Sequence, residues 1–244
     1  MTASSRDAAS SPGVTPFDHD VSRSGGYVYT TDAPLSARLA NRRLTVAALS
    51  VADFKEKRVL DIGCGDGTYT LELVDVAGAA SVQGIDPAGE AIRVARERVG
   101  DRPIAFSEGS AYELPHEADA FDLACLRGVL HHLERPAEAL REALRVAPWV
   151  VGVEPNGYNP GLKVLERCST YHVEHGERSF TARTLDGWVK AAGARIEART
   201  FAGFVPMFSP DWLARAMKRI EPAVEALPGV RTVGCAVYVF AAAR

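Results

Sequence analysis

The sequence predicts an α/β protein whose core is a doubly wound, mostly parallel β-sheet. From Lys57 onward, short apolar or β-branched runs alternate with longer amphipathic stretches, which is the pattern of consecutive βαβ units. One apolar run passes through an acidic residue straight into the glycine-rich stretch VLDIGCGDGTYT at residues 59–70. A chain of 244 residues with 47% hydrophobic composition is long enough to bury one large domain around this sheet.

The alternation predicts the elements of the first part of the sheet in order. Each expected strand is a short run of apolar and β-branched residues, and each expected helix is a longer amphipathic stretch. The strands are expected at residues 58–62, 81–86, 103–107, 121–126 and 149–154, and the helices near 68–76, 88–99 and 136–146.

After Pro155 the alternation loosens. The stretch before Thr181 holds a helix and a polar, aromatic loop, and Thr181 is a plausible N-cap for a helix that ends near Gly193. A strand is expected at 195–201, and a further helix starts at Ser209 and Pro210, with apolar residues at helical spacing. The chain closes on VGCAVYVFAA, which is a final strand pattern.

Composition and charge limit which partners the protein is expected to bind and in which compartment it is expected to lie. The net charge of -3, from 28 basic and 31 acidic residues, gives no basic field for a phosphate backbone, so nucleic acid is not an expected partner. The N-terminus lacks the apolar segment of a signal peptide, and no apolar run is long enough for a transmembrane segment. Residues 1–16, rich in Ser, Ala and Pro, are expected to be a disordered leader, and the expected location is the cytoplasm.

The four cysteines do not suggest a metal site or a disulfide framework. They lie far apart in the sequence and form no C-x-x-C pair, so we expect reduced thiols and no metal. These residues are Cys64, Cys125, Cys168 and Cys235.

The glycine-rich turn does not match a dinucleotide fingerprint. Glycine lets a strand-to-helix turn adopt positive φ and lets a ligand touch the main chain, and Gly63, Gly65 and Gly67 make such a turn. The third glycine of G-x-G-x-x-G, which admits a pyrophosphate, falls on Thr68 or Thr70 depending on where the pattern starts. The turn is therefore not expected to bind a pyrophosphate.

Two acidic residues flank this turn and point to a different ligand. Asp61 would repel a pyrophosphate but suits a cationic or amino-bearing group. Asp86 ends the second strand, where a carboxylate can accept two hydrogen bonds from a ribose diol. Together these residues describe a site for a nucleoside that carries an ammonium group.

The segments VLDIGCGDG and FDLACLRGVLHHLERP, with Asp86 between them, resemble the class I S-adenosylmethionine-dependent methyltransferases. The resemblance covers roughly residues 58–154. It implies a Rossmann-like methyltransferase fold, a seven-stranded sheet whose last strand is antiparallel, with S-adenosylmethionine as cofactor and S-adenosylhomocysteine as product. It also implies that residues 17–50 form an N-terminal helical lid and residues 51–244 the methyltransferase domain, with an acceptor-binding cap around 155–215.

The same resemblance assigns the cofactor contacts. Asp61 and the turn formed by Gly63, Cys64, Gly65 and Gly67 would meet the methionine part, and Asp86 the ribose hydroxyls. Ser110 and Ala111 would flank the adenine. Members of the family often have an acidic residue where Ser110 stands, so the contact to the adenine amino group is expected to be weaker or replaced here.

Arg127 and two histidines are candidates near the reacting groups. Arg127 directly follows the fourth strand, where it would reach the methionine carboxylate or the acceptor; the alternative is a solvent-facing arginine. His131 and His132 follow on a short helical segment. His132 would act as a general base or orient the acceptor, and otherwise it caps or packs its helix.

Four further residues are candidates for contact with the acceptor. Glu154 and Asn156 lie at the carboxyl end of the fifth strand, the edge where open α/β sheets place ligands, although a Glu-Pro-Asn turn is also ordinary loop chemistry. Tyr27 and Tyr29 are the lid candidates, in a segment that precedes a helix starting near Ser36. The alternative for both tyrosines is packing of a surface helix.

Two segments of the C-terminal half leave their roles open. The run FAGFVPMFSPDWLARAM fits core or cap packing, an apolar acceptor pocket, a homodimer surface, or contact with a membrane that carries a lipid-linked acceptor. His172 and His175 have a spacing that suits a metal only with further ligands, and they are interpreted as part of a polar loop at the pocket mouth.

The sequence thus predicts a cytoplasmic methyltransferase that acts on an oxygen or nitrogen of a small-molecule acceptor, such as a natural product or a sugar. The first alternative is an NAD-dependent oxidoreductase, which the missing third glycine and Asp61 disfavour. The second is a non-catalytic module that keeps the nucleoside site for regulation; Ser110 in place of an acid leaves this alternative open.

Overall fold

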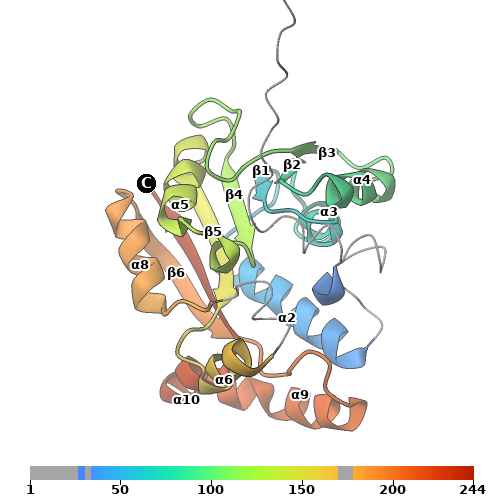
Figure 1. Cartoon of the computed structure of the whole chain (residues 1–244), viewed down its shortest axis with the longest axis vertical. Helices are drawn as coiled ribbons and strands as arrows, with labels where there is room; N and C mark the ends of the chain where they lie inside the picture. Colours follow the sequence, from blue (N-terminus) through green and yellow to red (C-terminus); the bar gives the residue numbers. More distant parts are fainter. Residues whose placement is uncertain (1–26, 31–33, 170–177) are drawn as a thin grey trace, which may run out of the picture.

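The computed structural model describes residues 27–30, 34–169 and 178–244 of the chain, and a seven-stranded sheet forms its centre (Figure 1). The strand order is β3-β2-β1-β4-β5-β7-β6. The strands are β1 (Arg58–Ile62), β2 (Ser81–Asp86), β3 (Ile104–Glu108), β4 (Leu123–Arg127), β5 (Trp149–Pro155), β6 (Arg195–Ala202) and β7 (Val237–Ala243). The neighbouring strands among β1 to β5 all pair in parallel, whereas β7 is antiparallel to both β5 and β6. The predicted doubly wound sheet with an antiparallel last strand is confirmed.

The order of the parallel strands reverses at β1. The chain adds β2 and β3 on one side of β1 and then crosses to place β4 and β5 on the other side. In open α/β sheets such a switch point, at the carboxyl ends of the strands, is where ligands bind. The glycine-rich turn after β1 lies at this point, since β1 ends at Ile62.

Helices cover both faces of the sheet. One apolar cluster joins one face to α5 and α8 through Leu140, Leu144 and Leu185, and a second joins the other face to α2 through Ala47 and Val51. This two-sided burial explains why the central strands have near-continuous apolar sequences. The helices are α2 (Leu35–Val51), α3 (Thr68–Asp75), α4 (Gly89–Arg98), α5 (Pro136–Val146), α6 (Pro160–Cys168), α8 (Ala182–Ala191), α9 (Asp211–Ala226) and α10 (Pro228–Gly234), with 3₁₀ turns η1 (Val28–Thr30) and η2 (Leu130–His132).

Local signals account for some of the helix boundaries. Thr181 caps α8 as predicted, because its hydroxyl accepts a hydrogen bond from the backbone N–H of Thr184 at 3.2 Å. The end of the chain differs from the prediction: the last strand begins at Val237, because the preceding residues form α10, with Pro228 at its first turn. The Asn156 side chain holds the end of this helix by donating to the carbonyls of Thr232 and Cys235.

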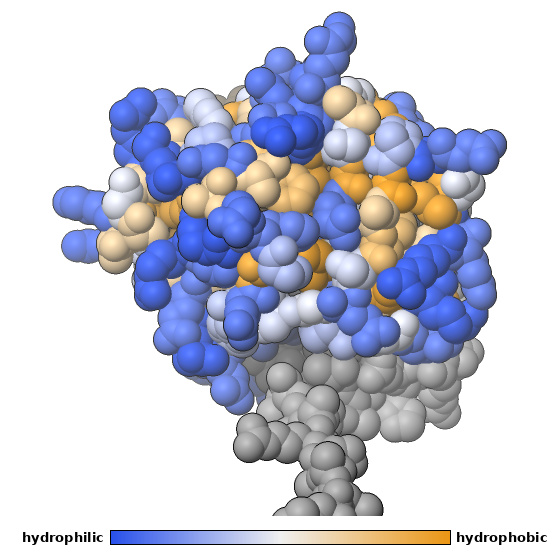
Figure 2. Space-filling view, turned by 90° about the horizontal axis from the view of Figure 1, so that it is seen from above, coloured by the Kyte–Doolittle hydropathy of each residue, from blue (hydrophilic) through white to orange (hydrophobic). Residues whose placement is uncertain are grey.

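The surface seen from above carries hydrophilic side chains around its rim and a band of hydrophobic side chains across the middle (Figure 2). None of the helices that the structure describes has the length and apolarity that crossing a membrane requires. The predicted leader at 1–16, parts of the segment 17–50, and both His172 and His175 lie outside the described residues.

Candidate functional site

The glycine-rich turn between β1 and α3 has a backbone that only glycine adopts readily. Gly63, Gly65 and Gly67 have φ values of 72°, 54° and 78°. The backbone N–H groups of Gly63 and Cys64 both donate to the carbonyl of Ile85, at 2.7 and 3.1 Å. The turn is therefore fixed against the end of β2.

The missing side chains of the three glycines make room for three different neighbours. A Cβ on Gly63 would lie 2.5 Å from Cγ2 of Val129, and one on Gly67 would lie 2.9 Å from the Phe106 ring. A Cβ on Gly65 would lie 2.5 Å from Cε2 of Tyr27. The outer glycines thus allow close packing of the chain, whereas Gly65 presents bare backbone to one of the predicted lid tyrosines.

Asp86 joins the end of β2 to this turn. Its carboxylate accepts hydrogen bonds from the backbone N–H groups of Gly65 and Ala88, both at 2.9 Å, and the side chain is buried. Each carboxylate oxygen has a second lone pair, so these contacts orient Asp86 without using all its acceptor capacity. The location at the carboxyl end of β2 is the one from which a carboxylate reaches a ribose.

Asp61 is the second acidic residue of the site and is almost fully buried, with 4% exposure. The Thr70 hydroxyl donates to its Oδ2 at 2.6 Å. Burial raises the pKa of Asp61 to about 6, although the Thr70 hydrogen bond and the nearby Arg127 charge oppose this shift. The residue is therefore mostly ionised at neutral pH, in surroundings that favour a cationic neighbour.

Arg127 does not face solvent. Its guanidinium donates to the Thr45 hydroxyl at 2.7 Å and to the Asn41 carbonyl at 3.0 Å, and it lies over the Tyr69 ring with Cζ 3.4 Å from the centroid. It therefore ties β4 to α2 and α3. A small cavity of about 20 Å³, lined among others by Asp61, Tyr69 and Arg127, lies beside this network and is large enough for one water molecule.

The segment 27–30 is fastened to the glycine-rich turn by Asp66. One carboxylate oxygen of Asp66 accepts from the backbone N–H of Tyr27 at 3.2 Å and from the Thr30 hydroxyl at 2.8 Å. The carbonyl of Tyr29 accepts from the Asn41 side chain at 2.9 Å and from the Tyr69 hydroxyl at 3.1 Å. The segment that contains both predicted lid tyrosines therefore covers the turn in this structure.

The two candidate histidines occupy η2, directly after β4. Glu154 is fully buried, and its carboxylate accepts from the backbone N–H groups of Val129 and Leu130, at 3.0 and 2.9 Å. Glu154 also lies 2.9 Å from Nδ1 of His131, so it fixes both the turn and the imidazole. The His132 ring packs on the His131 ring with centroids 3.8 Å apart, and His132 is half-buried.

The remaining predicted residues lie at the same edge of the sheet in different surroundings. Asn156 is fully buried and hydrogen-bonded to the chain segment before β7. Ser110 is exposed in the loop after β3, and its hydroxyl accepts from the backbone N–H of Tyr112 at 3.2 Å; Ala111 is half-buried beside it. In this structure the side chains of Glu154 and Asn156 therefore bond to the backbone and position the loops around the site.

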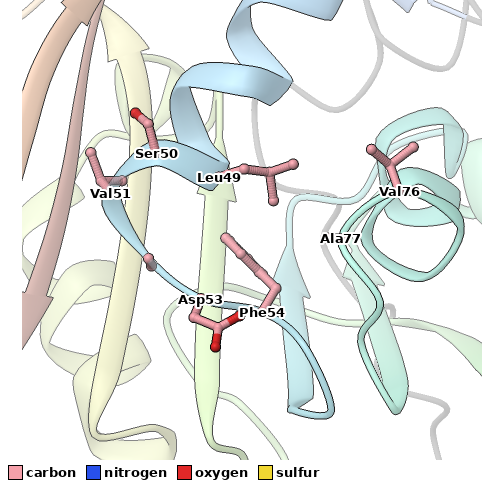
Figure 3. Close-up of a pocket in the computed structure, with 8 residues that line it drawn as sticks. Leu49, Ser50, Val51, Asp53, Phe54, Val76 and Ala77 are labelled. Atoms are coloured by element: carbon pink, nitrogen blue, oxygen red, sulfur yellow. The ribbon is translucent and has the colours of Figure 1, made fainter.

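A wider hollow lies at the opposite edge of the sheet. Figure 3 shows it at the end of α2, with a volume of about 420 Å³. It is formed by the connections that lead into β1 and β2, so it lies at the amino ends of the strands and away from the glycine-rich turn. Its lining residues are Leu49, Ser50, Val51, Ala52, Asp53, Phe54, Val76 and Ala77.

Several residues of the site were not predicted from the sequence, among them Asp66, Thr70 and Asn41. Asp66 lies inside the quoted glycine-rich stretch, and Thr70 one turn into α3, so their proximity to the site could have been inferred from the motif. Asn41 gave no comparable signal, because its contact with Tyr29 depends on how α2 packs.

Comparison with known proteins agrees with this geometry. Residues 60–148, which run from β1 to the residue before β5, match a family model described as a methyltransferase domain. The chain is 33% identical over 184 residues to an uncharacterized methyltransferase of Schizosaccharomyces pombe, covering 65% of this chain and 62% of that protein. It is 29% identical to a demethylmenaquinone methyltransferase of Clavibacter sepedonicus, covering 65% and 74%.

A third relative has a different acceptor in its name. The chain is 37% identical over 114 residues to a tRNA U34 carboxymethyltransferase of Methylococcus capsulatus, covering 46% of this chain and 34% of that protein. The chain therefore spans less than two thirds of the length of the Schizosaccharomyces pombe and Methylococcus capsulatus relatives, at 62% and 34%.

Solved structures share the fold at low sequence identity. A methyltransferase of Thermotoga maritima superimposes with a TM-score of 0.68 at 17% identity, covering 93% of this chain and 97% of that one. The [4+2]-cyclase SpnF superimposes with a TM-score of 0.66 at 22% identity, covering 95% and 92%. These similarities establish the fold and leave the reaction open.

The matched methyltransferase domain over residues 60–148, the strand order and the glycine-rich turn together support a class I S-adenosylmethionine-dependent methyltransferase. S-adenosylmethionine is the cofactor of this class, and a solved neighbour contains the product form. The described residues fit it: bare backbone at Gly65 faces Tyr27, Asp61 is a buried carboxylate, and Asp86 lies where a ribose is held.

We predict that Gly65→Ala weakens S-adenosylmethionine binding at least tenfold. The new Cβ would collide with Tyr27 and also require a left-handed backbone for alanine, which costs about 1–2 kcal/mol. Gly78→Ala is the matched control, because Gly78, in the turn after α3, has a similar φ of 73° but a Cβ there would make only an ordinary contact, 3.6 Å from Cγ of Lys55. Calorimetry and denaturant unfolding should show that both variants lose stability and only Gly65→Ala loses affinity; equal affinity in both would contradict the assignment.

Proposed function

We propose that this chain transfers a methyl group from S-adenosylmethionine to an oxygen or nitrogen of a small-molecule acceptor. The observation that carries the proposal is the pair of buried carboxylates, Asp61 and Asp86, on either side of a turn with a bare, positive-φ backbone. This arrangement suits a nucleoside with a positive charge. The methyltransferase domain matched over residues 60–148 supports it.

The cofactor would supply an electrophilic methyl group on a sulfonium sulfur. In the proposed site Asp61 and the turn of Gly63, Cys64, Gly65 and Gly67 hold the methionine part and Asp86 holds the ribose. Ser110 and Ala111 flank the adenine. Arg127 stabilises the floor of the site through its bonds to α2.

The lid is proposed to be the segment that Asp66 fastens over the turn. Tyr27 and Tyr29 would exclude water from the transfer, because a dry site strengthens the electrostatic contacts to the reacting groups. The hydrogen bonds of Tyr29 to Asn41 and Tyr69 support this role, since they position the segment from two different helices.

The remaining task of the protein is to align the acceptor and to remove its proton. Methyl transfer is an in-line displacement, so alignment contributes much of the rate. His132 is proposed as the general base or orienting group, with His131 fixed beneath it by Glu154. Glu154 and Asn156 are proposed to shape the acceptor side of the site by positioning its loops.

A small-molecule acceptor is favoured over RNA by charge. The sequence has a net charge of -3, whereas proteins that hold a phosphate backbone usually present a basic field. Relatives carry both kinds of acceptor in their names, a quinone and a tRNA. A natural product or a sugar remains the proposed acceptor, the cytoplasm the proposed location, and a homodimer one proposed assembly.

A non-catalytic nucleoside-binding module is the second candidate function. The exposed Ser110, in a position where an acidic residue often contacts the adenine amino group in this class, favours it. Such a module would bind S-adenosylmethionine without passing its methyl group on.

Transfer of a labelled methyl group tests the proposal. The protein is incubated with methyl-tritiated S-adenosylmethionine and an extract of the source cell, which is then separated into small-molecule, RNA and protein fractions. We expect label in the small-molecule fraction, and a loss of about 10²–10⁴-fold in rate for His132→Ala if His132 is the base. Label only in RNA contradicts the acceptor, and no transfer at all favours the binding module.

The affinity for S-adenosylmethionine should depend on pH through Asp61. The pKa of Asp61 is about 6 in the free protein, and a bound cation favours its ionised form, so affinity should fall as the pH drops below about 6. The limiting slope is about tenfold per pH unit. Titrations between pH 5 and 7 check this: Asp61→Asn should bind weakly at every pH, and His132→Ala should keep the wild-type slope. An unchanged slope in Asp61→Asn would assign the effect to another group.

A further inference from the structure

Large exposed hydrophobic side chains are concentrated in one region of the described chain, the helices α6, α9 and α10 and the loops beside them. Figure 1 shows these three helices together at the lower edge of the molecule, below the sheet. A surface of this kind on a globular protein usually marks an interaction site. The residues are Tyr158, Val164, Leu165, Phe208, Trp212, Ile220, Leu227, Val230 and Val233.

The outer face of α9 carries a continuous apolar stripe. Trp212 is 71% exposed and Ile220 is 51% exposed, and Ala216 lies midway between them at the four-residue spacing that keeps side chains on one helix face. Ala223 is also exposed, and Leu227, which follows the helix, is 55% exposed. The stripe therefore runs the length of the helix.

Beyond its first turn, α9 has arginine side chains on its exposed face and glutamate side chains on the face that packs against the protein. Arg215 and Arg219 are exposed beside the stripe. Glu221 is 2% exposed, and its carboxylate accepts from the backbone N–H of Phe204 at 3.1 Å. Glu225 faces inward and pairs with Arg43 at 2.6 Å. The outer face beyond the first turn is therefore apolar and cationic.

Helix α6, whose N-cap Asn159 donates to the carbonyl of Cys235 at the end of α10, repeats this arrangement. Val164 and Leu165 are exposed with Arg167 beside them in sequence, whereas Glu166 is turned inward and accepts from the backbone N–H of Ser179 at 2.7 Å. Apart from Asp211 in the first turn of α9, the two helices thus show apolar and basic side chains to solvent while their acidic side chains bond to the chain.

We propose that the stripe of α9, with Arg215 and Arg219, is a docking face for an anionic phospholipid surface. Helices that lie in the plane of a membrane interface have an apolar face, with tryptophan among its residues, flanked by basic side chains. A second copy of the chain is a poorer occupant, because a two-fold contact would place Arg215 and Arg219 of both copies against each other.

The docking face lies next to the proposed lid. Phe208, in the loop before α9, contacts Tyr29, with ring centroids 5.6 Å apart. A protein held on a bilayer through α9 would therefore have its lid segment close to the membrane surface, where an acceptor dissolved in lipid could reach it. This consequence rests on the proposed function, whereas docking itself does not.

Sedimentation with lipid vesicles tests the proposal. The full chain is mixed with vesicles of phosphatidylcholine alone or of phosphatidylcholine with phosphatidylglycerol, at low and high salt. We expect binding to the anionic vesicles only, weakened by salt, and reduced at least tenfold in Ile220→Glu and several-fold in Arg219→Gln. Val76→Glu is the matched control, because Val76 is 62% exposed on a different part of the surface and should bind as the wild type does.

Three results would overturn the proposal. One is a wild-type protein that stays in the supernatant, and another is equal loss of binding in Ile220→Glu and Val76→Glu. The third is a wild-type dimer in analytical ultracentrifugation that Ile220→Glu dissociates, which would make the face a contact between copies. The affinity for S-adenosylmethionine, measured without vesicles, should be unchanged in Ile220→Glu, so failure of docking is distinguishable from failure of the cofactor site.

Discussion

The burial of the Asp61 carboxylate beside a left-handed glycine turn is the constraint on which the rest of the site depends. A buried acidic group needs hydrogen bonds and a nearby positive charge, and Thr70 and Arg127 supply them here. Arg127 in turn binds the Asn41 carbonyl on α2, and the Asn41 side chain binds Tyr29. One network therefore connects the floor of the proposed cofactor site to the segment that covers it.

Buried carboxylates also organise the proposed acceptor side of the site. Glu154 uses its oxygens to satisfy backbone donors that the turn after β4 leaves without helical partners, and the same carboxylate orients His131. The Asp66 carboxylate likewise fixes the glycine-rich turn. It accepts hydrogen bonds from the segment before α2 and from the backbone N–H of Thr68 at the start of α3. The loops at the carboxyl edge of the sheet are thus held by side chains from neighbouring segments.

The sequence predicted the parts of the fold that local patterns encode. Strand and helix periodicity located the sheet elements to within a few residues, and the glycines, Asp61 and Asp86 marked the turn because their roles follow from backbone geometry and charge. The partners of Arg127 could not be predicted, since Thr45 and Asn41 are more than 80 residues away in sequence. The end of the chain was predicted less well. The run VGCAVYVFAA has a strand pattern, but its first two residues, Val233 and Gly234, form the end of α10, and β7 begins at Val237.

The central claim is that the glycine-rich turn binds a sulfonium nucleoside and not a dinucleotide. Isothermal titration calorimetry of one protein sample with S-adenosylmethionine and with NADH distinguishes a sulfonium nucleoside from a dinucleotide. The buried Asp61 and the threonine in place of a third glycine predict saturable binding of S-adenosylmethionine and no binding of NADH. Binding of NADH in the absence of any S-adenosylmethionine binding would contradict the account.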